Sequence, residues 1–169
     1  PLMLTEDEIE VAVLGARWVA GRADPALARA AEDLIAKIAA TVPERLRPYA
    51  LEPASRAPPA RNPSIDSLDM PRTRAHIHAG RKIAFTYRDK RERESRRTVW
   101  PVAIGYFEAV RLLVGWCELR RDFRNFRTDR VAAAEFLDER YPERPAVLRA
   151  KWQRSLALER RCLFDKTTT

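Results

Sequence analysis

Arginine side chains in the second half of the sequence are the best candidates for chemistry. Four of them stand in regions of strand-like pattern, namely Arg97, Arg124, Arg127 and Arg130. A guanidinium group is planar and offers several N–H donors at fixed geometry, which suits the oxygens of a phosphate group. We therefore predict that these four arginines bind phosphate, with the hydroxyl groups of Tyr87 and Ser95 as additional donors.

The spacing of the last three arginines limits how they can meet. A flat strand would place Arg124 and Arg130 on one face and Arg127 on the other. All three converge only if a bulge or a bend intervenes. Phe123 and Tyr106 could stack on bases, but Phe123 is expected to pack into the core rather than to stack. The alternative for the arginines is a solvated surface with local ion pairs to Glu118, Asp122 and Asp129.

The positive charge of the chain is concentrated in its middle. The 169 residues carry a net charge of +8, and residues 72–130 alone contribute 16 basic and 7 acidic side chains. Residues 1–71 carry a net −3, and residues 131–169 a net +2. A local field of this sign attracts polyanions such as nucleic acids or phosphorylated ligands. GC-rich codon usage is an alternative explanation for the excess of Arg over Lys, but it does not explain the clustering.

Several classes of protein are excluded by the composition. No window approaches about 18 consecutive apolar residues, so we predict no transmembrane helix. The acidic start and the two isolated cysteines, Cys117 and Cys162, favour a reduced, cytoplasmic protein without a metal site. We find no glycine-rich phosphate loop and no G-x-S-x-G motif, so we predict neither an enzyme nor a cofactor.

The first 50 residues have the pattern of short helices. Thr5 and Glu8 form a capping box before an amphipathic stripe that predicts a helix over residues 5–20. A second helix is predicted to begin at Asp24-Pro25, and a short turn is predicted between Pro43 and Pro48. Helices of this length bury little by themselves, so their apolar stripes need a partner. We predict that residues 1–50 mediate homodimerisation.

The rest of the chain predicts an α+β fold. A short helix is expected from Asp69 to Gly80, and residues after Pro145 are helical in pattern. Alternating apolar residues predict strands between them, at residues 83–87, 95–105, 110–119, 123–131 and 134–137. Such short strands without intervening helices favour a small barrel or a strongly bent sheet. The predicted divisions are residues 1–50 (helical), 51–70 (proline-rich linker), 71–140 (barrel) and 141–169 (helical extension).

The segment from Ile77 to Val131 resembles a WYL domain. The matching motifs are Arg81-Lys82, Ile83 to Tyr87, Ser95-x-Arg97 with Pro101, Leu113 to Cys117, and Asp122-Phe123-Arg124-Asn125-Phe126-Arg127-Thr128-Asp129-Arg130-Val131. The sequence departs from the pattern at the triplet that names the family, where Arg111-Leu112-Leu113 stands instead of Trp-Tyr-Leu. The resemblance implies a Sm-like, SH3-type β-barrel over residues 82–138.

The resemblance also implies a function. Residues 1–8 resemble the junction that follows a winged helix-turn-helix in bacterial transcriptional regulators of this family. The resemblance thus implies a DNA-reading module upstream of Pro1 that would bind operator DNA, and a barrel that senses a nucleotide or oligonucleotide effector. The alternative function is a module that binds single-stranded nucleic acid directly.

Overall fold

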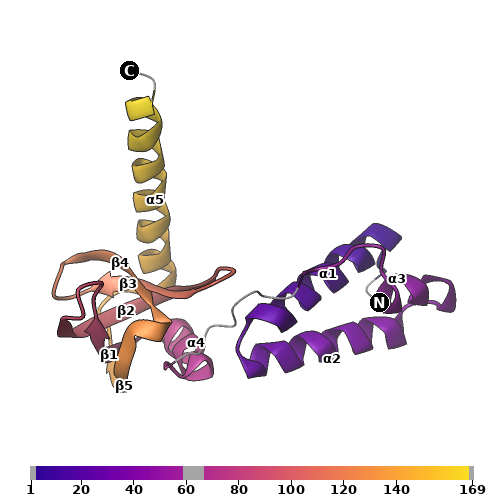
Figure 1. Ribbon diagram of the computed structural model, residues 1–169, viewed down its shortest axis with the longest axis horizontal. Helices are drawn as coiled ribbons and strands as arrows, with labels where there is room; N and C mark the ends of the chain where they lie inside the picture. The colour runs from indigo at the N-terminus through magenta and orange to yellow at the C-terminus, as the bar shows by residue number, and fades with distance from the viewer. Residues whose placement is uncertain (1–2, 59–66, 168–169) are drawn as a thin grey trace. The chain divides into compact units, whose positions relative to one another are not determined.

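The computed structural model describes residues 3–58 and 67–167 (Figure 1). The chain divides into two compact units, a helical unit of residues 1–64 with 106–109, and a sheet unit of residues 65–105 with 110–169. The linker predicted at residues 51–70 therefore lies partly outside the described residues. We describe each unit by itself. Within the described residues, no helix has the length and apolar character needed to cross a membrane.

The helical unit consists of α1 (Glu6–Arg22), α2 (Pro25–Thr41), the 3-10 turn η1 (Glu44–Leu46) and α3 (Arg47–Leu51). The predicted starts of α1 and α2 are confirmed, since Thr5 forms the capping box with Glu8 and the Asp24 carboxylate accepts hydrogen bonds at the start of α2. The prediction that Pro48 ends a turn was wrong. Pro48 lies in the first turn of α3, where the missing N–H costs no hydrogen bond.

The sheet unit contains the remaining elements. They are α4 (Met70–Ala79), β1 (Arg81–Arg88), β2 (Glu94–Tyr106), β3 (Arg111–Cys117), β4 (Asp122–Arg127), the 3-10 turn η2 (Thr128–Arg130), β5 (Val131–Arg140) and α5 (Pro145–Thr167). As predicted, Asp69 caps the start of α4 and Gly80 ends it in the left-handed conformation, with φ of 69°. The strands form one antiparallel sheet in the order β4-β3-β2-β1-β5, which confirms the α+β prediction.

The predicted closed barrel is not confirmed, because the sheet is open. Strands β4 and β5 lie at opposite ends of the hydrogen-bonded order. The predicted strand 123–131 is divided, since η2 interrupts it after Arg127 and the chain then pairs with β1 as β5. The sheet is nevertheless strongly bent. The ring of Phe126 on β4 packs edge-on against Phe85 on β1 at a centroid distance of 5.1 Å, although two strands separate them.

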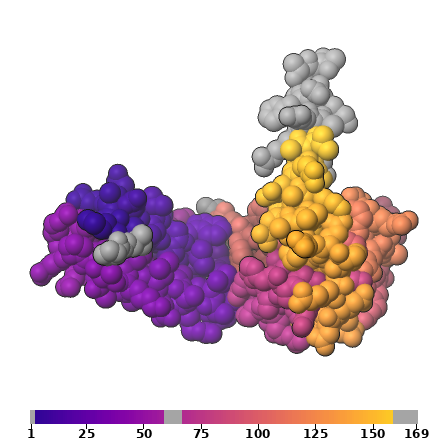
Figure 2. All heavy atoms as spheres, turned by 180° about the vertical axis from the view of Figure 1, so that it is seen from behind, coloured from indigo at the N-terminus to yellow at the C-terminus, as the bar shows by residue number. Residues whose placement is uncertain are grey.

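Each face of the sheet carries its own apolar cluster. The first, called the inner cluster here, consists of Leu68, Met70, Ile83, Phe85, Val99, Leu113, Cys117, Phe126 and Val131. The opposite face carries Val102, Tyr141 and Leu148, with Trp100, Trp116, Phe123 and Trp152 packed against them. Leu148 and Trp152 belong to the first turns of α5, which then extends away from the sheet (Figures 1 and 2).

Candidate phosphate-binding site

A pocket of about 310 Å³ lies where the inner cluster meets polar side chains. It is lined by Tyr87, Asp89, Arg97, Cys117, Arg120, Arg124, Asn125 and Phe126. Cys117 and Phe126 are buried members of the inner cluster, so the pocket borders the core directly. Three of the lining residues are arginines and one is an acid, so the wall is predominantly cationic.

The strand register explains why these residues meet. Phe85 of the inner cluster pairs with Arg97 across β1 and β2, and Tyr87 pairs with Ser95. Because side chains alternate along a strand, Tyr87 and Arg97 project from the same face as Phe85. Arg124 stands two residues before Phe126 on β4 and therefore belongs to this face as well. The sequence thus places three of the predicted residues in one pocket through periodicity and bending of the sheet.

Arg97 is the arginine best prepared for an external anion. Its side chain is half-buried, and its Nε donates to the Ser95 hydroxyl oxygen at 3.1 Å. Within the described residues, Arg97 has no carboxylate at ion-pair distance. Arg124, by contrast, is exposed and pairs with Asp122 at 3.0 Å. Ser95 therefore orients Arg97 without neutralising it, and the terminal N–H groups of Arg97 keep their hydrogen-bonding capacity.

Tyr87 supplies a second oriented donor. Its hydroxyl oxygen accepts a hydrogen bond from the backbone N–H of Arg127 at 3.3 Å. The hydroxyl proton of Tyr87 consequently remains available for a ligand oxygen. Together, Tyr87 and Arg97 present donors to the pocket, as an acceptor-rich group such as phosphate requires.

The other two predicted arginines are placed outside this pocket. The Arg127 side chain forms a two-pronged ion pair with Asp129, at 3.0 Å from Nε and 2.7 Å from Nη2. The carboxylate raises the pKa of Arg127, and the guanidinium lowers the pKa of Asp129. Arg130 lines a separate hollow of about 420 Å³ together with Asp129, Arg88 and Ser67. The series Arg124, Arg127 and Arg130 therefore does not converge.

Five of the eight lining residues were not predicted, and two of these five, Asp89 and Arg120, carry a charge. Both lie in hairpin turns, Asp89 between β1 and β2 and Arg120 between β3 and β4. In a run of antiparallel strands these two turns fall at the same end of the sheet, and this signal could have identified them.

The candidates for base stacking lie outside the pocket. Phe123 packs against Trp116 on the opposite face of the sheet, and the Tyr106 hydroxyl donates to Asp24 at 3.3 Å in the helical unit.

Comparisons with known proteins find one matching family model. It is described as the WYL domain and matches residues 71–136, which agrees for that stretch with the resemblance seen in the sequence. The match includes every residue that lines the pocket.

One solved structure with similarity to the chain is the proteasome accessory factor B/C of Arthrobacter aurescens. It has 20% sequence identity and a TM-score of 0.37, over 84% of this chain and 21% of that protein. This chain thus spans about a fifth of the length of that protein. At such a TM-score the two structures do not define a common fold. No curated protein matches the sequence.

Proposed function

We propose that this chain is the effector-sensing part of a bacterial transcriptional regulator, and that its WYL domain binds a nucleotide-like phosphorylated ligand in the pocket. Arg97 carries the proposal. It is half-buried on the core face, held by Ser95, and has no carboxylate partner within the described residues. The WYL match supports the sensing role. Recognition of operator DNA is left to a winged helix-turn-helix outside residues 1–169.

Binding of a short single-stranded oligonucleotide tests the pocket. We expect a fluorescence-anisotropy titration to give an affinity that falls as the salt concentration rises, because each phosphate contact releases a counterion. Charge reversal by Arg97→Glu is expected to weaken binding by at least tenfold, since it replaces a charge-assisted donor with a repelling carboxylate. The matched control is Arg96→Glu, because Arg96 belongs to the opposite face of β2 and pairs with Glu135.

Three outcomes would contradict parts of the proposal. If Arg97→Glu and Arg96→Glu reduce affinity equally, the effect is one of overall charge and the pocket has no role. If neither oligonucleotides nor cyclic nucleotides bind, the ligand proposal fails. If the chain binds duplex operator DNA specifically, the DNA-reading surface lies within residues 1–169, against the proposal.

We also propose that the helical unit pairs with a second copy of itself. A hollow of about 400 Å³ between α1 and α2 has an apolar lining that includes Val11, Gly15, Leu27 and Leu34. Val11 is 71% exposed and Leu34 47% exposed. A unit of so few helices cannot bury this exposed apolar surface within itself, which favours burial against another chain.

Light scattering tests the dimer. The chain is expected to be a dimer at micromolar concentration, and Val11→Lys combined with Leu34→Lys is expected to give a folded monomer, because two charges would have to be buried. The matched control is Glu32→Lys on α2, an exposed polar position that does not line the hollow. A wild-type monomer, or a dimer that persists in the double variant, would contradict the proposal.

A further inference from the structure

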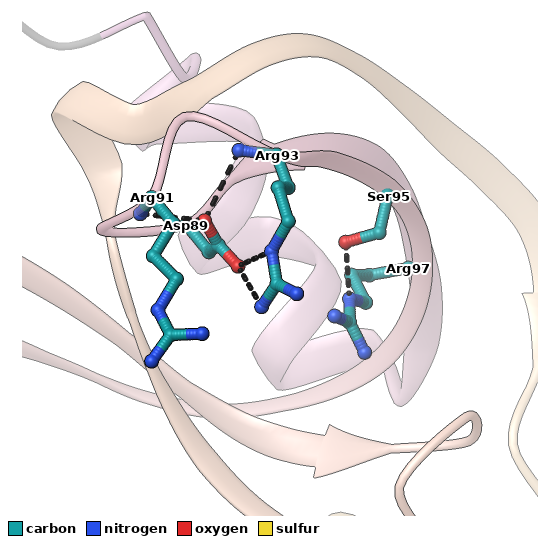
Figure 3. A network of polar contacts seen from close by, with 5 residues as sticks. All are labelled: Asp89, Arg91, Arg93, Ser95 and Arg97. Carbon is teal, nitrogen blue, oxygen red and sulfur yellow. Dashed lines mark hydrogen bonds and ion pairs between the residues drawn. The ribbon is translucent and has the colours of Figure 1, made fainter.

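We infer that the turn between β1 and β2 forms a second phosphate subsite beside the pocket, built from Arg93 held by Asp89. The inference rests on the proposed function, because it concerns the same ligand. It names the ligand more closely, as a molecule that carries at least two phosphate groups. Figure 3 shows the residues concerned, with the Arg93 guanidinium drawn between the Asp89 carboxylate and the Ser95–Arg97 pair.

The Asp89 carboxylate is fully occupied by the turn itself. Its Oδ1 accepts the backbone N–H groups of Arg91 at 2.7 Å and Arg93 at 3.1 Å. Its Oδ2 accepts Nε of Arg93 at 3.0 Å and Nη2 of Arg93 at 2.8 Å. The backbone hydrogen bond from Arg93 is the largest of the effects that lower the pKa of Asp89. Asp89 thus has no free acceptor for a ligand and instead fixes the orientation of Arg93.

Arg93 keeps donors for a ligand despite this pairing. A guanidinium group has five N–H donors, and the contact to Asp89 uses the one on Nε and one on Nη2. The remaining three lie at the end of the side chain, which is 70% exposed. An arginine that is held on one edge by a carboxylate loses little further freedom when its other edge binds a phosphate. The end of Arg93 is therefore a preorganised anion contact.

The position of the turn links Arg93 to the pocket. Asp89 itself lines the pocket together with Arg97 and Arg120. Arg93 is bonded directly to Asp89, so its guanidinium stands at the pocket margin while Arg97 stands inside. Two separate guanidinium groups, each oriented by a neighbouring side chain, suit two phosphate groups better than one.

Titrations with matched nucleotides test the subsite. The probes are AMP with one phosphate, ADP with two adjacent phosphates, and the dinucleotide pApA with two phosphates separated by a nucleoside. We expect the full chain to bind one of the two-phosphate probes about tenfold more tightly than AMP in isothermal titration, the increment of one charge-assisted contact. The better probe shows whether the two phosphates are adjacent or separated.

Two variants test whether Arg93 supplies this tenfold difference in affinity. Arg93→Gln is expected to bring the affinity for the better probe down to that for AMP. Because the substitution also removes the side-chain partner of the Asp89 carboxylate in the pocket wall, the readout is the ratio of the two affinities and not the affinity for AMP alone. Arg96→Gln removes the same charge from the opposite face and is expected to preserve the preference. Circular dichroism is expected to show both variants folded, since both side chains are exposed.

Each remaining outcome counts against the subsite. If the chain binds AMP, ADP and pApA equally, the inference is wrong while the pocket itself stands. The same holds if Arg93→Gln weakens AMP and the two-phosphate probes by the same factor, or if Arg96→Gln removes the preference equally well. If none of the probes binds the wild-type chain, the proposed function fails for these ligands, and the subsite fails with it.

Discussion

Replacing Gly115 by Ala is expected to destabilise the sheet unit by about 3 kcal/mol, the upper end of the usual cost of overpacking. A Cβ atom at this position on β3 would lie 2.3 Å from Cγ1 of Val99 and 2.7 Å from the carbonyl oxygen of Trp100. The valine methyl can rotate away, but the carbonyl belongs to the backbone of β2, so the two strands would have to separate. Urea unfolding followed by tryptophan fluorescence measures the effect, because Trp100, Trp116 and Trp152 lie in the sheet unit.

The control substitution is expected to change the stability in the opposite direction. Gly21 lies in α1, and a Cβ at this position meets nothing within 4 Å. Replacing Gly21 by Ala is expected to stabilise the helical unit by up to about 1 kcal/mol, because Ala has the higher helix propensity. If Gly115→Ala unfolds at the same urea concentration as the wild type, the packing between β2 and β3 is looser than described.

Phe85→Ala is expected to cost about 3–5 kcal/mol, as for other fully buried aromatic residues. Phe85 has no exposed surface, and its ring contacts Tyr87 and Phe126 at centroid distances of 6.3 Å and 5.1 Å. Both neighbours line the pocket, so the variant is expected to lose ligand affinity as well as stability. Thermal unfolding and the oligonucleotide titration together measure the two effects.

Leu119→Ala serves as the control for Phe85→Ala in the same unit. Leu119 lies in the turn between β3 and β4 and is 61% exposed, so its truncation is expected to change the stability by less than about 0.5 kcal/mol. A Phe85→Ala variant as stable as Leu119→Ala would mean that the inner cluster does not hold the sheet together.

The parts of the fold that could be predicted from the sequence are those fixed by near neighbours. The capping box at Thr5, the Asp24 cap and the left-handed Gly80 each depend on a few consecutive residues. The strands followed from alternation, which also depends only on local sequence. Closure of the sheet was not predictable in this way, because it depends on where β4 and β5 pair, and η2 redirects the chain between them.

The pocket could be predicted from the sequence only where strand periodicity determines the position of a side chain. Periodicity places Tyr87 and Arg97 on the core face, and Arg124 joins them because it alternates with Phe126. Arg130 falls outside because η2 ends the strand periodicity before it. Asp89 and Arg120 belong to turns, where strand periodicity does not apply; the topology places the two turns at one end of the sheet, but it does not specify which of their side chains reach the pocket.

The position of the pocket on the core face has a practical consequence for testing the proposed ligand. Folding of the sheet unit and formation of the pocket are one and the same event, since Cys117 and Phe126 belong to both. A ligand that binds only the folded state then raises the unfolding free energy by mass action, by about 2.7 kcal/mol at a concentration one hundred times its Kd. A thermal-shift screen of phosphorylated metabolites therefore tests the proposed class of ligand directly.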